Sequence, residues 1–264
     1  MSYPGSKAQA GTWQRIIGQM PPHALYVEAF AGSAQIYFRK RPAAHSLLID
    51  LAPSVIARLN ARIRSAAAGA GDVAICGDAI SILPTLNLPA DAVVYCDPPY
   101  LLSTRQGRFY YDHEMTDADH CRLLAMLQGL PARVLLSGYP SALYAETLAG
   151  WRCLAYRART RHRTLTECLW CNFPEPTELH DWRYAGLNFR QRLSLKRLAA
   201  RWLARLERMP PLKRGYVLNA IAQRPAGPNA EPGAAVPNAR SAAAGLPISP
   251  KPVRGPGQAK PVFG

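Results

Sequence analysis

The stretch Ala92-Val93-Val94-Tyr95-Cys96-Asp97-Pro98-Pro99-Tyr100 decides the fold. Its first five residues form an apolar run, and a short run of this kind predicts a buried strand of a parallel sheet. Pro98 ends that strand, because proline fixes φ and has no backbone donor. Two consecutive prolines make the turn stiff with its carbonyls pointing outward, so that a carboxylate and a phenol ring face one ligand. Such a turn suits chemistry on an amine.

Four further apolar segments predict strands that alternate with helical patterns through the first half of the chain. They cover residues 25–30, 46–50, 73–76 and 133–137, while the strand before Asp97 begins at residue 91. Pro53 opens one of the intervening helices, and Thr116 with Asp119 three residues later caps another. The alternation predicts an α/β fold with a mainly parallel, twisted sheet, helices on both faces, and a ligand crevice at the carboxyl ends of the strands.

The second half of the chain is strongly basic. The net charge of the chain is +15. Residues 1–150 contribute little to it, with 12 Lys and Arg residues against 11 Asp and Glu residues, whereas residues 151–264 hold 20 Lys and Arg residues against 6 Asp and Glu residues. Two strands at 151–159 and 164–173 flank a basic tip, and a helix is predicted at 190–209. The asymmetry indicates a catalytic domain at 1–175, a basic helical extension at 176–223 that binds a polyanion, and a disordered Pro/Gly/Ala-rich tail at 224–264. A role of the charge in solubility alone is the alternative.

Composition also bounds the location and the chemistry. No apolar stretch is long enough to cross a bilayer, and the first residues lack the features of a signal peptide, so a cytoplasmic location without a membrane partner is expected. The six cysteines are scattered, and Cys168 and Cys171 form a lone CxxC whose members face opposite sides of a strand. No disulfide framework is therefore predicted. His113 and His120 lack the spacing of metal ligands, so no metal site is predicted either.

Acids at the predicted strand ends suggest a nucleoside site. Small residues occupy 31–34, where the first strand is expected to turn into its helix, but the GxGxxG fingerprint of nicotinamide and flavin enzymes is absent. Asp50 ends the second predicted strand, at the spacing from which an acid reaches a ribose hydroxyl, and Asp78 follows the third. Each acid alone could be an ordinary strand-end cap, but with Asp97 they favour a nucleoside on one rim.

With these elements in order, the chain resembles the DNA adenine methylase family over residues 2 to about 220, and in particular its compact, often phage-borne members. Tyr3-Pro4-Gly5-Ser6-Lys7 is similar to the N-terminal element of that family, Glu28 to Ala34 to its E-P-F-x-G-x-G/A element, and Asp97 to Tyr100 to its catalytic DPPY. Further similarity extends over 111–120, 137–139 and 167–170. Two positions depart from the pattern, with Ala29 in place of proline and Ala34 at a site that is commonly glycine.

The resemblance implies a Rossmann-like class I methyltransferase fold and transfer of a methyl group from S-adenosylmethionine to the N6 amine of adenine in DNA. It implies that Asp97 and the Pro98 carbonyl accept hydrogen bonds from the amine, with Pro99 stiffening the turn and Tyr100 stacking on the base. The cofactor-binding residues that it implies are Tyr3, Lys7, Glu28, Phe30, Gly32, Ser33, Asp50, Asp78 and Asp97.

Double-stranded DNA is the expected partner, with the target base flipped into the pocket, and no obligate protein partner is indicated. A loop at 101–115 is expected to meet DNA beside the pocket, and basic residues elsewhere are expected to contact phosphates. Together these nucleic-acid-binding residues are Arg105, Arg108, Tyr110, Tyr111, Arg159, Arg161, Arg163, Arg197, Arg201 and Arg205. Cytosine N4 in DNA, adenine in RNA, a glutamine side chain, and a catalytically silent nucleic-acid-binding protein remain alternatives.

Overall fold

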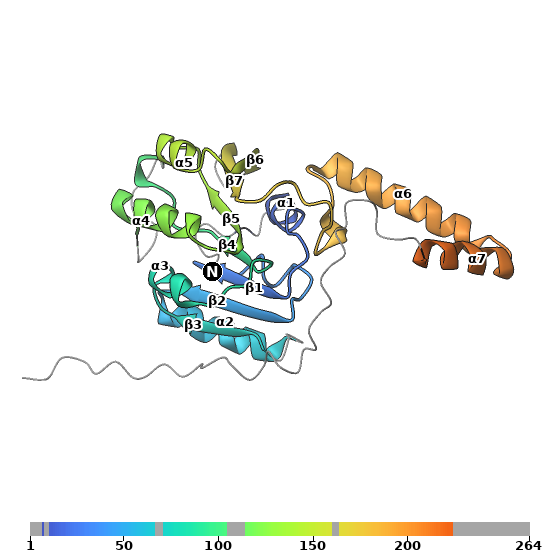
Figure 1. Cartoon of the computed structure of the whole chain (residues 1–264), viewed down its shortest axis with the longest axis horizontal. Helices are drawn as coiled ribbons and strands as arrows, with labels where there is room; N and C mark the ends of the chain where they lie inside the picture. The colour runs from blue at the N-terminus through green and yellow to red at the C-terminus, as the bar shows by residue number, and fades with distance from the viewer. Residues whose placement is uncertain (1–6, 8–10, 67–70, 105–113, 160–163, 224–264) are drawn as a thin grey trace, which may run out of the picture. The chain divides into compact units, whose positions relative to one another are not determined.

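The computed structural model describes residue 7 and residues 11–66, 71–104, 114–159 and 164–223 (Figure 1). The predicted tail at 224–264, most of the predicted DNA loop and the basic tip at 160–163 lie outside the described residues. By contacts between residues, the chain forms two compact units, Met1–Leu203 and Ala204–Gly264. The predicted domain boundaries at 175 and 223 stay predictions.

A seven-stranded sheet forms the centre of the first unit. Its strands are β1 (Leu25–Ala29), β2 (His45–Asp50), β3 (Val73–Cys76), β4 (Val93–Cys96), β5 (Arg133–Gly138), β6 (Arg152–Arg159) and β7 (Thr164–Cys171). They lie in the order β3-β2-β1-β4-β5-β7-β6. The first five are parallel, whereas β7 runs antiparallel to both β5 and β6. This is the predicted Rossmann-like class I methyltransferase fold, with every predicted strand present.

Helices cover both faces of the sheet, because consecutive residues of each buried strand point to opposite sides. One face packs against α1 (Thr12–Ile17) and α2 (Pro53–Ser65). The other face packs against α3 (Ala79–Ile82), α4 (Asp117–Gln128) and α5 (Ala142–Thr147). Tyr26 and Leu48 lie in the first of these cores, and their chain neighbours Val27 and Ile49 lie in the second. Cys171 and Cys168 divide in the same way, as the sequence predicts.

Local signals place two of the helices as predicted. Pro53 is the first residue of α2, where its missing N–H costs no hydrogen bond. Thr116 caps α4: its hydroxyl accepts from the Asp119 amide at 3.2 Å, and the Asp119 carboxylate accepts from the Thr116 amide at 2.9 Å. This reciprocal pair is a capping box, and it fixes where α4 begins.

The segment after β1 differs from the prediction. A helix was expected to follow the first strand, but residues 31–40 form turns. The Phe38 amide donates to the Ala34 carbonyl at 3.1 Å and the Lys40 amide to the Ile36 carbonyl at 3.0 Å, without a continuous helical ladder. Positive φ angles at Phe30, Gly32 and Ala34 interrupt the regular geometry that a helix would need.

Two helices follow the sheet in the chain. They are α6 (Phe189–Glu207) and α7 (Pro211–Ala222), and short 3-10 turns lie at Leu83–Thr85, Leu102–Thr104 and Trp182–Tyr184. The helix predicted at 190–209 ends two residues early, since Pro211 opens α7. Neither helix buries a residue. None of the helices in the described ranges is long and apolar enough to span a membrane.

Candidate functional site

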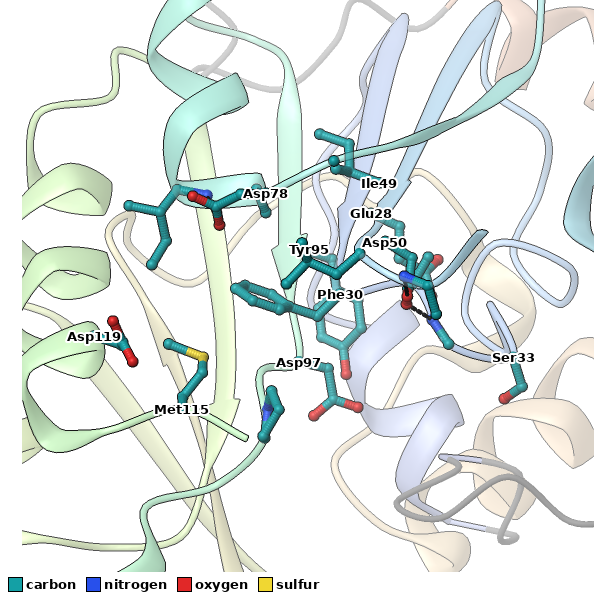
Figure 2. A pocket seen from close by; sticks show the side chains of 18 of the residues that line it. Glu28, Phe30, Ser33, Ile49, Asp50, Asp78, Tyr95, Asp97, Met115 and Asp119 are labelled. Atoms are coloured by element: carbon teal, nitrogen blue, oxygen red, sulfur yellow. Dashed lines mark hydrogen bonds between the residues drawn. The ribbon is translucent and has the colours of Figure 1, made fainter. Parts of the chain in front are cut away.

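A cavity of about 310 Å³ lies at the carboxyl ends of β1, β2, β3 and β4 (Figure 2). The register explains how these ends meet: Ala29 of β1 pairs with Cys96 of β4 and with Ile49 of β2, while Asp50 pairs with Cys76 of β3. The residues that follow each strand therefore line one crevice. Glu114, Met115, Asp119 and Arg122, around the start of α4, also line it.

The turn after β1 brings backbone to the cavity. Phe30, Gly32 and Ala34 have φ angles of 58°, 51° and 48°, in the left-handed region that only glycine adopts without cost. Two hydrogen bonds hold the turn: the Ala31 amide donates to the Ile49 carbonyl at 2.9 Å, and the Gly32 amide donates to Asp50 Oδ2 at 2.8 Å. Strained backbone held in this way is common at ligand sites.

Asp50 and Asp78 line the cavity and cap the backbone at the same time. Besides Gly32, Asp50 binds the Ala52 amide, which donates to Oδ1 at 2.9 Å. Asp78 caps α3, accepting from the Ile80 amide at 3.1 Å and from the Ser81 hydroxyl at 2.6 Å. An acid at a strand end can therefore cap the backbone and also bind a ligand, because each carboxylate oxygen has a second lone pair that can accept another hydrogen bond.

Glu28 lies at the buried end of the cavity. Its Oε2 accepts from the Tyr26 hydroxyl at 2.8 Å and from the Tyr37 amide at 2.9 Å. Burial raises the pKa of Glu28 to about 8, although both hydrogen bonds and the charge of Lys40 favour the ionised form. At neutral pH this carboxyl group therefore keeps its proton, and it adds little negative charge to the site.

The Asp97-Pro98-Pro99-Tyr100 turn adjoins the same cavity. Asp97 and Pro99 line it, whereas Pro98 is buried and neither Pro98 nor Tyr100 is among its lining residues. The Lys7 ammonium lies 2.9 Å from Asp97 Oδ1 and also donates to the Tyr100 hydroxyl. Burial raises the pKa of Tyr100, and the nearby Asp97 and Glu167 charges raise it further, so the phenol stays protonated. The side chain of Asp97 remains 19% exposed, which leaves it open to a ligand.

Several residues of this corner could not be assigned from the sequence. Glu167 of β7 is buried, lies 3.7 Å from the Lys7 ammonium and accepts from the Tyr156 hydroxyl at 3.3 Å. Tyr139 packs edge-on against Tyr100, with ring centroids 4.5 Å apart. Tyr139 and Glu167 both lie in segments that resemble the family, 137–139 and 167–170, but the resemblance implied no role for either. Glu167 also stands directly before the apolar run Cys168-Leu169-Trp170, where a buried carboxylate requires partners.

The lining of the cavity is acidic in a chain that is basic overall. Of the residues that the structure describes, two cationic ones, Lys7 and Arg122, line it. Against these stand six acidic residues, which are Glu28, Asp50, Asp78, Asp97, Glu114 and Asp119. Asp119 and Arg122 form an ion pair at 2.5 Å. Asp97 is likewise paired with Lys7, and Glu28 keeps its proton, so the charges of Asp50 and Asp78 favour a ligand that carries positive charge near the strand ends.

The structure brings most of the predicted site residues together. Of the predicted cofactor-binding residues, eight line the cavity, and Tyr3 lies outside the described residues. Those eight are Lys7, Glu28, Phe30, Gly32, Ser33, Asp50, Asp78 and Asp97.

The predicted nucleic-acid-binding residues are only partly described. Arg197, Arg201 and Arg205 are exposed on α6. Arg159 ends β6, but its side chain is not described. The others lie outside the described residues; they are Arg105, Arg108, Tyr110, Tyr111, Arg161 and Arg163.

Within the described ranges, no group of three or more histidine, cysteine, aspartate or glutamate side chains could hold a metal ion. His120 is buried, with Nδ1 3.0 Å from the Tyr144 hydroxyl. Burial raises the pKa of Cys168 and of Cys171 to about 12, so both thiols stay protonated at neutral pH. These groups belong to the core.

No protein-family model matches the sequence, and no curated protein matches it. Solved structures do match. Magnesium protoporphyrin IX methyltransferase (ChlM) from Synechocystis PCC 6803, with bound SAM, is 16% identical at a TM-score of 0.43, over 61% of this chain and 75% of that one. TrmK from M. capricolum, in complex with S-adenosyl-homocysteine, is 9% identical at a TM-score of 0.43, over 79% and 93%.

A dimethyladenosine transferase from Plasmodium falciparum is 12% identical at a TM-score of 0.42, over 62% of each chain. At these identities and TM-scores the similarity carries no argument about activity. The fold rests on the strand order of the sheet, and the function has to be argued from the site.

Proposed function

We propose that this chain is an S-adenosylmethionine-dependent methyltransferase that modifies the exocyclic N6 amine of adenine in double-stranded DNA. The observation that carries the proposal is the Asp97-Pro98-Pro99-Tyr100 turn, which lends Asp97 and Pro99 to the lining of an acidic cavity at the carboxyl ends of parallel strands. This is the edge of an α/β sheet at which ligands bind.

The cavity fits the proposed cofactor in size and charge. Its volume of about 310 Å³ lies at the lower end of the range for small-molecule sites. The carboxylates of Asp50, Asp78 and Asp97 suit the hydroxyl, amine and cationic groups of the cofactor, and the turn at Gly32 allows a close approach to backbone. Bound S-adenosylmethionine would supply a methyl group activated by its own sulfonium.

The proposed task of the turn is to orient a weak nucleophile. The N6 amine of adenine reacts poorly, because its lone pair is delocalised into the ring. Asp97 and the Pro98 carbonyl would accept from its two N–H groups and draw the nitrogen toward tetrahedral geometry, which is electrostatic and orientational catalysis. Tyr100, held by Lys7 and packed against Tyr139, would stack on the base. The Lys7 ammonium lies over the Tyr100 ring, 4.7 Å from the centroid, so the base would take the opposite face.

The charge of the chain supports a polyanionic partner. Its net charge of +15 favours association with phosphates, although the cavity itself is acidic. Arginines recur along one side of α6, at positions 190, 197, 201 and 205 of the chain. In a helix, a spacing of seven and then four residues places side chains on one stripe, and like charges so placed repel unless anions lie between them.

The test is methyl transfer with an identified product. Full-length protein is incubated with isotope-labelled S-adenosylmethionine and unmethylated duplex DNA, and the digested nucleosides are separated by mass spectrometry. We expect label in N6-methyldeoxyadenosine, a loss of at least about a hundredfold in Asp97→Ala, and no loss in Asp91→Ala. Asp91 is the matched control, because it is an exposed acid at the opposite end of β4. Equal rates for the two variants would contradict the proposal.

The same digest separates the remaining candidates. Label in N4-methyldeoxycytidine would identify a different planar amine as the acceptor. A parallel reaction with RNA tests adenine in that polymer, and a glutamine acceptor would place the label in protein. A silent nucleic-acid-binding protein would bind DNA without incorporating label.

A further inference from the structure

Lys7 lies between two carboxylates that come from different strands. Its ammonium is 2.9 Å from Asp97 Oδ1, after β4, and 3.7 Å from Glu167 Oε2, on β7. The lysine side chain is only 7% exposed, so its charge is largely removed from water. A buried ammonium needs neighbouring negative charge to stay protonated, and Asp97 alone is partly exposed.

Glu167 is also held by a tyrosine, at the same oxygen that faces Lys7. The Tyr156 hydroxyl, on the adjacent strand β6, donates to Glu167 Oε2 at 3.3 Å. The Tyr156 ring is in turn covered by Arg15 of α1, whose guanidinium lies 4.5 Å from the ring centroid. A continuous series of contacts therefore leads from the antiparallel edge of the sheet to the Asp97 carboxylate.

We propose that Glu167 is a positioning residue of the catalytic turn: it keeps Lys7 charged and in place, so that Lys7 holds Asp97 by Oδ1. The second oxygen of Asp97 then accepts from the substrate amine, since a carboxylate can bind donors at both oxygens. The inference rests on the proposed function for the role of Asp97. Glu167 itself touches neither substrate nor cofactor in this scheme.

The charges around Lys7 set the expected pH behaviour. Asp97 and Tyr100 face it from the turn after β4, Glu167 faces it from β7, and Glu28 of β1 lines the same cavity with its proton retained. Neutralising Glu167 removes one of the two carboxylates that, among the described residues, form ion pairs with the ammonium. At a separation of 3.7 Å, this lowers the pKa of Lys7 by about one to three units.

The first experiment needs neither cofactor nor DNA. Lysine carbons are labelled with carbon-13, the Lys7 signal is assigned by its loss in Lys7→Arg, and its pKa is measured by NMR titration of the full chain. We expect the predicted fall in Glu167→Gln and no change in Glu178→Gln, an exposed control. Glu167→Asp keeps the charge one methylene farther away and should lie between. An unchanged Lys7 pKa in Glu167→Gln overturns the proposal.

The second experiment measures methyl transfer. In Glu167→Gln we expect kcat to fall about tenfold, with the alkaline limb of its pH profile moved to lower pH and the KM for S-adenosylmethionine little changed. A lower kcat with an unmoved alkaline limb would mean that Glu167 acts only through stability, and would overturn the positioning role. Wild-type protein that transfers no methyl group to nucleic acid refutes the proposed function, whereas the NMR titration still decides the Lys7–Glu167 interaction.

Discussion

Asp50→Asn tests whether one carboxylate holds the turn of the candidate site. Asp50 is nearly buried, and its two oxygens accept separately from the Gly32 amide at 2.8 Å and the Ala52 amide at 2.9 Å. Asparagine has the same shape but only one acceptor oxygen. Whichever amide keeps that oxygen, the other amide then faces the NH₂ group, and two donors oppose each other.

The expected cost follows from these two contacts. A hydrogen bond to a charged acceptor contributes about 1.5–3 kcal/mol, and a buried donor left without a partner costs about 1–3 kcal/mol. One bond weakens from a charged to a neutral acceptor and the other is lost. With allowance for the partial access of water to the site, we expect the free energy of unfolding to fall by about 2–4 kcal/mol.

The assay is urea unfolding followed by circular dichroism and by tryptophan fluorescence. Asp91→Asn is the matched control, because Asp91 is exposed and its substitution should change stability by less than about 0.5 kcal/mol. We expect a lower midpoint for Asp50→Asn with an unchanged m value. Equal midpoints for the two variants would refute the inference that Asp50 holds the turn, and with it the account of how Gly32 is presented to a ligand.

Two further predictions concern the buried acid and the basic helix. Glu28 has a folded pKa of about 8 against 4.5 when unfolded, so the folded state binds the extra proton between these values and stability falls as pH rises through that window. The loss is at most about 1.4 kcal/mol per pH unit. Glu28→Gln imitates the protonated form, so its free energy of unfolding, measured in urea at pH 5.5, 7 and 8, should depend less on pH than that of the wild type. An equal pH dependence in the two proteins would contradict the raised pKa of Glu28. Replacing Arg197, Arg201 and Arg205 together by glutamine should reduce the slope of log K against log salt for DNA binding by about 2–3. Arg58→Gln with Arg64→Gln, on the exposed side of α2, should leave that slope unchanged, and an unchanged slope in the triple variant would remove α6 from the DNA interface.

The sequence predicts the sheet well because the signals are local. Four of the five parallel strands end at or directly before an acid or a glycine, and a strand buried on both faces needs no pattern other than a short apolar run. The capping box of α4 is also predicted from a local signal, since Thr116 and Asp119 are three residues apart. Asp50, Asp78 and Asp97 were found because parallel strands bring their carboxyl ends to one edge.

The contacts of Lys7 and the turn after β1 could not be predicted. Lys7 is 90 residues from Asp97 and 160 from Glu167 in the numbering of the chain, so no local pattern connects them. In the turn, Phe30 and Ala34 adopt positive φ without being glycine, which no residue preference anticipates. The Ala31 and Gly32 amides of this turn donate to Ile49 and Asp50 of β2. These hydrogen bonds hold the turn, and they form only when β1 and β2 pair in the sheet.

The cavity and the chain as a whole carry charge of opposite sign. At physiological salt, exposed charges more than about 8 Å apart in water are largely screened from each other, so the residues that line a site decide which ligands it attracts. A net charge of +15 would disfavour a cationic ligand if it acted uniformly over the molecule. Carboxylates within contact distance of the ligand reverse that effect locally, since unscreened charges interact most strongly at short range. An acidic cavity in a basic chain is therefore what an enzyme requires if it brings a sulfonium cofactor to a polyanionic substrate.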